Sequence, residues 1–192
     1  PTKQAWVFVF DRETGEPVWP IEEQPVDPSD VPGELLSPTQ PHPTKPPAFD
    51  RQGVGPEDLI DFTLELREMA LEILNRRRYG RSIYTPPSVA TADGTLGTMQ
   101  VPSSTGGVNW PGGSLDPKTG IYYQYSKSEI TSLGLVNDPE RSDMNFISGR
   151  PEGVSAADAA LNIRGIPILK PPWGRITAID LNTGDILWQI PH

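Results

Sequence analysis

The sequence contains no cysteine and only two histidines among its 192 residues. Disulfides and thiolate metal sites are therefore excluded, and His42 and His192 are not spaced as metal ligands. Basic residues are also in deficit, and the formal net charge of −9 argues against nucleic acid as a partner, because phosphate binding needs a basic face. No apolar run approaches the roughly 18 residues that cross a bilayer. Phosphate-binding glycine loops and nucleophile elbows are missing as well.

Proline and glycine are abundant instead, with 23 and 18 copies. Together with a hydrophobic content of 35%, they indicate a loop-rich β protein with irregular insertions. The chain opens on Pro1, with no initiator methionine and no signal-peptide pattern. We therefore expect a processed or excised piece of a longer protein.

One pattern recurs along the chain: Asp, two residues, Thr-Gly, three residues and Trp. Complete copies occupy Asp11–Trp19 and Asp180–Trp188, and a weaker copy at Asp116–Gln124 has glutamine in place of tryptophan. Each copy predicts a hairpin, in which Asp accepts backbone hydrogen bonds and Gly supplies a positive φ. Repeated hairpins leave apolar faces that only neighbouring copies can cover, so the pattern favours a β-propeller over chance recurrence.

The remaining periodicities predict several strands and one helix. Thr63 is placed to cap the helix, which carries an apolar stripe, and Gly80 is placed to end it. The arginines at 76–78 favour a charge complement to the helix C-terminus over a nucleic-acid contact. The stripe consists of Leu66, Met69, Ala70, Ile73 and Leu74, and the expected strands are Gln4–Phe10, Thr98–Val101, Ile121–Tyr125, Ile176–Ile179 and Ile186–Ile190.

Uneven spacing of the three copies predicts two insertions, at residues 20–80 and 135–164. The first begins with prolines every few residues from Pro20 to Pro47, which argues against a continuous strand or helix. Apolar anchors such as Leu35 and Phe49 favour an ordered surface loop there over a disordered linker.

The longer form of the pattern, with Ala178 two residues before Asp180, resembles the blade signature of quinoproteins, dehydrogenases that carry pyrroloquinoline quinone (PQQ) at a propeller axis. In that family the Trp of one blade packs on the Thr-Gly turn of the next. Lys3–Arg12 resembles the family segment Lys-x-Gly-x-x-x-Val-x-Asp-Arg, with Ala5 in place of the glycine. Further segments are similar to membrane-type quinoprotein glucose dehydrogenases in the same order: Ser37–Pro41, Arg81–Ser88, Gly97-Thr98, Gly106–Trp110 and Lys170–Gly174.

This resemblance implies an all-β fold, with residues 1–192 forming about three blades of an eight-bladed propeller and one helix inside the Pro-rich insertion. It implies that Lys3 contacts the quinone oxygens and acts in catalysis, that Asn109 hydrogen-bonds PQQ, and that Trp110 lies beside the cofactor. The family's general base and its Ca²⁺ or Mg²⁺ ligands precede the Lys segment, so none is expected in this chain. Without the resemblance, Lys3 would be interpreted as a solvated surface group, as a lysine near a terminus usually is. Asn109 and Trp110, which lie between two pairs of glycines, would be interpreted as an ordinary turn.

The implied activity is oxidation of a sugar or alcohol by hydride transfer to the quinone, with a quinone or cytochrome as electron acceptor. The implied location is the periplasm, with or without membrane association. We expect the chain alone to be inactive and to associate with the remainder of its propeller or with itself. The alternative is a non-enzymatic propeller scaffold, which would not be expected to retain Lys3 and Asn109.

Overall fold

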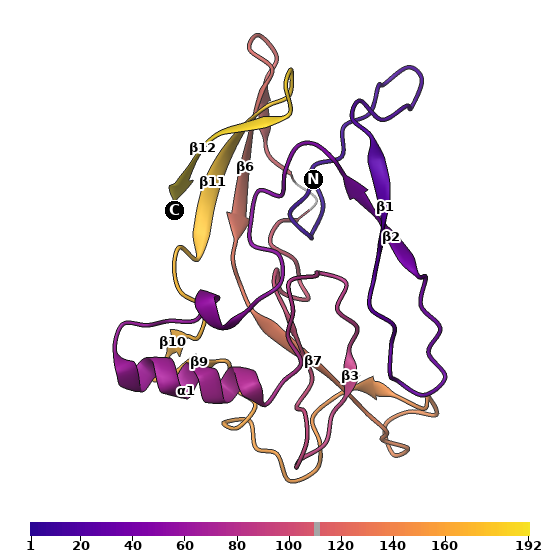
Figure 1. Ribbon diagram of the computed structural model, residues 1–192, viewed down its shortest axis with the longest axis vertical. Coiled ribbons are helices and arrows are strands. Elements are labelled where there is room, and N and C mark those ends of the chain that lie inside the picture. The colour runs from indigo at the N-terminus through magenta and orange to yellow at the C-terminus, as the bar shows by residue number, and fades with distance from the viewer. Residues whose placement is uncertain (110–111) are drawn as a thin grey trace.

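The computed structural model describes residues 1–109 and 112–192, which form mainly strands (Figure 1). Within them lie the α-helix α1 (Leu64–Asn75) and a 3₁₀ turn, η1 (Pro56–Asp58). The strands are β1 (Ile21–Pro25), β2 (Thr39–Pro43), β3 (Ser88–Val89), β4 (Thr98–Gln100), β5 (Ser114–Asp116), β6 (Ile121–Lys127), β7 (Thr131–Val136), β8 (Ile147–Ser148), β9 (Asn162–Ile163), β10 (Ile166–Pro167), β11 (Gly174–Asp180) and β12 (Asp185–Pro191).

The main sheet has four antiparallel strands in the order β12-β11-β6-β5. A second sheet orders β3-β7-β4, with β8 also paired to β7, and the pairs β1-β2 and β9-β10 form separate two-stranded ribbons. In Figure 1 the N-terminus lies between the main sheet and the β1-β2 ribbon, and α1 lies beside the β9-β10 hairpin. The predicted all-β fold with a single inserted helix is confirmed over the described residues.

The turns of the repeated pattern form as the sequence predicts. The Asp11 carboxylate accepts hydrogen bonds from the backbone N–H of Thr14 and Glu13, at 2.8 and 2.9 Å. The backbone bond from Thr14 is the main reason that the pKa of Asp11 is lowered, and the Thr119 hydroxyl lowers that of Asp116 in the same way. A carboxyl group whose pKa is lower in the folded than in the unfolded protein stabilises the folded protein when it is ionised. Both turns therefore contribute stability at neutral pH, and this contribution is lost as the pH falls through the folded-state pKa values.

The second and third copies of the pattern lie in the same sheet. β6 pairs with β11 along its whole length, from Ile121 opposite Asp180 to Lys127 opposite Gly174. The two turns meet at one end, where Leu181 N donates to Gly120 O at 2.9 Å. The weaker copy at Asp116–Gln124 and the complete copy at Asp180–Trp188 are neighbouring hairpins of one four-stranded sheet. The copies therefore do not each mark a separate blade.

The first copy is a shorter hairpin than the sequence predicts. Its ladder is reduced to a bridge between Phe10 and Pro17, and no regular strand spans residues 4–10. A tight turn takes up the start of this segment, because Ala5 N donates to Thr2 O at 3.0 Å. Pro17 also lacks the N–H that a longer ladder would use.

The aromatic contact that the family resemblance implies is present between the first and third copies. Gly184 has a φ of +74°, and a Cβ placed there would lie only 3.0 Å from Cζ2 of Trp19. Trp19 therefore packs directly on the Thr-Gly turn that precedes β12. The same turn is held by Lys45, whose Nζ donates to Thr183 O at 2.9 Å and to Asp185 at 3.0 Å.

The Pro-rich segment forms a β ribbon, so our expectation that its prolines prevent strand formation is wrong. Thr44 N donates to Pro20 O and Val26 N donates to Pro38 O just outside the two ends of β1 and β2. Since hydrogen-bonded and non-hydrogen-bonded pairs alternate along an antiparallel ladder, every proline within the ribbon falls at a non-hydrogen-bonded site. These prolines are Pro25, Pro41 and Pro43, which pair with Thr39, Glu23 and Ile21.

Helix α1 forms where the stripe predicts it. The Thr63 hydroxyl accepts from Leu66 N at 3.2 Å, and Ala70 and Leu74 are fully buried. The arginines follow the helix rather than occupying its last turn, because the helix ends at Asn75. Arg77 nevertheless turns back and donates to the carbonyl of Ile73 at 2.8 Å, and burial lowers its pKa to about 10.

Residue 135, at which the sequence predicts that the second insertion begins, lies inside β7. Gly134 makes this strand hard to recognise in the sequence, yet it permits close strand contact. A Cβ at Gly134 would lie 2.9 Å from both Ala90 Cβ and Leu96 O. β7 can therefore approach its neighbours only without a side chain at this position.

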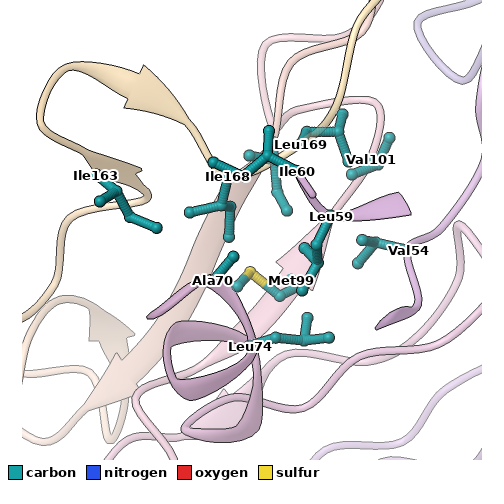
Figure 2. Close-up of a cluster of buried hydrophobic side chains, with 11 residues drawn as sticks. Val54, Leu59, Ile60, Ala70, Leu74, Met99, Val101, Ile163, Ile168 and Leu169 are labelled. Carbon is teal, nitrogen blue, oxygen red and sulfur yellow. The ribbon is translucent and has the colours of Figure 1, made fainter. Parts of the chain in front are cut away.

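The larger core lies between α1, β4 and the segment after β10 (Figure 2). In Figure 2 Leu74 and Ala70 project from the helix toward Met99 and Ile168. A smaller core packs the N-terminal segment against the inner face of the main sheet, and its buried residues are Ala5, Val7, Phe49, Val108 and Ile179.

The contact between Trp19 and Gly184 can be separated from backbone strain. In the full-length protein, Gly184→Ala adds a Cβ both at a positive φ and against Trp19 and the Lys45 stem, whereas Gly15→Ala adds one at a φ of +77° with no atom within 4 Å. We expect Gly15→Ala to lower the free energy of unfolding by about 1 kcal/mol and Gly184→Ala to lower it by at least about 1 kcal/mol more. Chemical denaturation measures both, and equal losses would contradict the close packing of Trp19 and Lys45 on this turn.

Candidate functional site

Lys3 lies in the N-terminal turn, with its side chain exposed. The turn is closed by Thr2 N donating to Trp6 O at 2.8 Å and by Ala5, which has a φ of +73°. This left-handed conformation costs an alanine about 1 kcal/mol or more, and glycine adopts it freely. The position where the family segment has glycine therefore needs glycine's conformation here too, although this chain has alanine.

The loop that carries Asn109 packs against Lys3. Gly107 N donates to Lys3 O at 3.0 Å. Gly106 has a φ of +91°, and a Cβ there would lie 2.6 Å from Lys3 Cβ, so only glycine allows the lysine stem to lie on this loop. The structure thus brings two of the three predicted site residues to adjacent backbone segments. Trp110, the third, lies outside the described residues.

The side chains of Lys3 and Asn109 line two separate cavities. Lys3 borders a cavity of about 200 Å³ together with Gln100, Ser103 and Ser104. Asn109, which is exposed, borders one of about 190 Å³ together with Tyr125 and Lys127. Each cavity alone is smaller than a typical small-molecule site of roughly 300 Å³ or more.

The end of β6 and its connection to β7 contact both cavities, because Lys127 lines the Asn109 cavity and Glu129 bonds to Ser103 of the Lys3 cavity. Sequence reasoning did not identify this segment. Lys127 N donates to Gly107 O at 2.8 Å, and Lys127 Nζ pairs with Glu129 at 2.6 Å. Ser103, from the Lys3 cavity, donates to Glu129 at 3.2 Å. The hydrogen bond from Lys127 holds the pKa of Glu129 below its usual range. The run Lys127-Ser128-Glu129 at the end of β6 was the available signal for a polar rim at this strand end.

A buried ion pair fixes this connection in place. The Asp50 side chain is 0% exposed and that of Arg175, in β11, is 12% exposed, with Arg175 Nη2 at 3.5 Å from Asp50 Oδ1. Ser128 donates to Asp50 and accepts from Arg175 at 3.2 Å. Three remote segments, around residues 50, 128 and 175, therefore meet at one carboxylate.

Neither a metal cluster nor a membrane helix is found in the described part of the chain. Residues 1–109 and 112–192 contain no group of three or more acidic or histidine side chains placed to hold a metal ion. None of the helices in these ranges has the length and apolarity to cross a bilayer.

The Asp-x-x-Thr-Gly hairpin turns, the packing of Trp19 on one of them and the four-stranded antiparallel sheet fit part of a β-propeller of the quinoprotein class. The chain belongs to the PQQ family: the family model described as glucose/ethanol/alcohol dehydrogenase, beta-propeller domain, matches residues 1–192.

Its curated relatives include three named dehydrogenases. The chain is 30% identical to quinate/shikimate dehydrogenase (quinone) of Acinetobacter baylyi, over 99% of the chain and 24% of that protein. It is 32% identical to the glycerol dehydrogenase large subunit of Gluconobacter thailandicus, over 100% of the chain and 28% of that protein. It is 30% identical to quinoprotein glucose dehydrogenase of Escherichia coli, over 98% of the chain and 24% of that protein. The chain thus spans about a quarter of the length of these relatives.

The buried ion pair predicts a large stability effect at a single carboxylate. In the full-length protein, Asp50→Ala leaves the buried Arg175 without its partner, so we expect the free energy of unfolding to fall by about 3 kcal/mol or more. Asp30→Ala is the matched control, because Asp30 pairs with Arg78 at the surface and should cost less than about 1 kcal/mol. If chemical denaturation gives similar losses for both variants, the Asp50 pair does not hold these segments together.

Proposed function

We propose that this chain forms part of a PQQ-dependent dehydrogenase that oxidises a sugar or alcohol and passes electrons to a quinone or cytochrome. The observation that carries the proposal is the packing of the Lys3 stem on Gly106, which fixes a lysine beside the Asn109 loop. Membership in the family supports this class of reaction, and the named relatives act on quinate or shikimate, glycerol and glucose. We place the whole protein in the periplasm.

The residues present suit one side of a planar, anionic cofactor. Within the described residues, Lys3 is in no ion pair, so its ammonium group is available to a ligand with carboxylates and quinone oxygens. The side chain of Asn109 makes no hydrogen bond to another described residue, and its amide can donate one. Lys3 and Asn109 would therefore hold PQQ.

PQQ, when bound, supplies a quinone that accepts two electrons. Lys3 would place a positive charge beside the quinone oxygens, where it would favour negative charge on them. The Asn109 amide would orient the quinone by hydrogen bonding. Glu129 stays ionised because its pKa is lowered, so it is a weak base near neutral pH. We assign the general base and the Ca²⁺ or Mg²⁺ ligands to parts of the protein outside these residues.

The outer face of the main sheet supports a further partner, the remainder of the propeller. Trp188 and Ile190 project from β12, and Tyr125 projects from β6, on the side opposite Phe49. Each of these side chains is more than 40% exposed. We propose that another sheet of the same protein covers this face, as Trp19 covers the turn at Gly184.

An isolated 192-residue chain should therefore associate and should not oxidise substrates. We expect light scattering to show oligomers or aggregates, because an apolar sheet face and the β12 edge are exposed. With added PQQ and Ca²⁺, dye reduction with glucose, glycerol or quinate should not exceed that of a heat-treated sample. A compact monomer would contradict the proposed partner, and reproducible dye reduction would show that the base lies within this chain.

Lys3 provides the direct test of the proposed role. In the full-length enzyme, Lys3→Ala should lower kcat by about 10²-fold, with little change in substrate KM, because it removes one preorganised charge. Lys3→Arg should restore only part of the activity, since a planar fork does not replace a compact ammonium. Equilibrium PQQ binding should weaken in parallel in Lys3→Ala.

Lys118→Ala is the matched control for this test. Lys118 is exposed in the turn before β6 and should tolerate the change. If kcat and PQQ affinity in Lys3→Ala stay within twofold of this control, Lys3 is an ordinary surface residue. A non-enzymatic propeller scaffold would then explain the chain better.

A further inference from the structure

A third cavity, of about 480 Å³, adjoins the two that contain Lys3 and Asn109. Lys127 lines both this cavity and the one at Asn109. Glu129 also lines it, and accepts the hydrogen bond from Ser103 of the Lys3 cavity. The third cavity therefore shares one lining residue with the Asn109 cavity and is linked to the Lys3 cavity by one hydrogen bond.

The floor of the cavity is apolar and one wall is a fixed indole. Ile130, Leu161 and Leu169 line the floor. Trp173 is 41% exposed, and its Nε1 donates to Leu169 O at 2.7 Å. Its own carbonyl accepts from Ser128 N at 2.8 Å. Because the polar edge of the indole is already hydrogen-bonded, the ring is held still and offers apolar surface to a ligand.

The polar groups lie at the rim. Lys127 and Glu129 are the charged residues among those that line the cavity, and their ion pair makes the rim electrically neutral. Asn162, from β9, is exposed, and its amide makes no hydrogen bond to a described side chain or carbonyl. The rim therefore offers a carboxylate acceptor and an amide that both donates and accepts.

We infer that this third cavity binds the ring of a cyclic, uncharged polyhydroxy substrate, with the ring against Trp173 and its hydroxyls bonded to Glu129 and Asn162. The inference rests on the proposed dehydrogenase function and narrows its substrate class. A pyranose ring combines apolar C–H faces with hydroxyls at its edge, which matches an apolar wall with a polar rim. A two-carbon alcohol would leave most of a 480 Å³ cavity unfilled. An anionic ring finds no net positive charge at the rim.

The test compares two variants of the full-length, PQQ-loaded enzyme. Trp173→Phe and Trp173→Leu both lose the bond to Leu169, but only Trp173→Phe retains an aromatic face. We expect Trp173→Leu to raise the KM for glucose about tenfold with kcat within twofold, and Trp173→Phe to raise it much less. Calorimetric binding of glucose to the cofactor-free protein should weaken in the same order. Equal effects of the two variants would overturn the stacking role.

A charge variant tests the preference for an uncharged ring. Glu129→Gln leaves Lys127 unpaired, so the rim gains a positive charge while an oxygen acceptor remains. We expect the ratio of the KM for quinate to the KM for glucose to fall at least about threefold in this variant, and Asn162→Ala to raise the KM for glucose. Asn145→Ala, between β7 and β8, is the control and should change neither value. An unchanged ratio in Glu129→Gln would overturn the assignment of this rim.

The outcomes separate this inference from the proposed function. If the parent enzyme oxidises none of glucose, glycerol, quinate and ethanol with PQQ, the dehydrogenase function fails. If the parent enzyme is active but prefers ethanol, or if Trp173→Leu leaves glucose binding and KM unchanged, the dehydrogenase function stands and the cavity is not its substrate site.

Discussion

The buried carboxylate of Asp50 is the constraint on which the arrangement of the site depends. A charge removed from water is tolerated best where it is paired and hydrogen-bonded, and Arg175, Ser128 and the backbone of residue 51 all meet Oδ1 of this carboxylate, while Oδ2 has no hydrogen-bond partner among the described residues. These contacts to Oδ1 join the segment that follows the prolines, the β6-β7 connection and the start of β11. The β6-β7 connection follows Lys127 and carries Glu129, and both residues line the third cavity, which shares Lys127 with the Asn109 cavity. Electrostatic contacts therefore help to hold the residues that border these cavities.

Much of the fold was predictable because local rules and tertiary contacts agree. The Asp-x-x-Thr-Gly turns are built by hydrogen bonds between neighbours, so they appear in the sequence and in the structure alike. The same holds for α1, where Thr63, the apolar stripe and the buried Ala70 and Leu74 are consistent. The strands that the sequence did not predict depend on partners far away in the sequence. β7 needs Gly134 to approach β3 and β4, and the β1-β2 ribbon depends on a register that places each proline where no ladder bond is required.

In the candidate site, too, some residues were expected from the sequence and others are positioned only by contacts between distant segments. Lys3 and Asn109 were expected from a resemblance, and the structure brings their segments into contact through Gly106 and Gly107. The rim at Lys127 and Glu129 and the wall at Trp173 are set by contacts across the chain, such as the bond from Ser128 N to Trp173 O. No spacing rule relates these positions. They become visible only once β6 and β11 are paired.

The prolines of the β1-β2 ribbon have a consequence for the outer edge of the molecule. A non-hydrogen-bonded site directs its N–H away from the partner strand, toward any new strand that approaches from outside. At Pro41 and Pro43 of β2 that donor does not exist, so two successive outward-facing positions on this edge cannot donate a hydrogen bond to an incoming backbone. A two-stranded ribbon without this feature would be a template for sheet extension between molecules. The prolines that seemed to forbid a strand therefore allow one to lie at the surface without recruiting another.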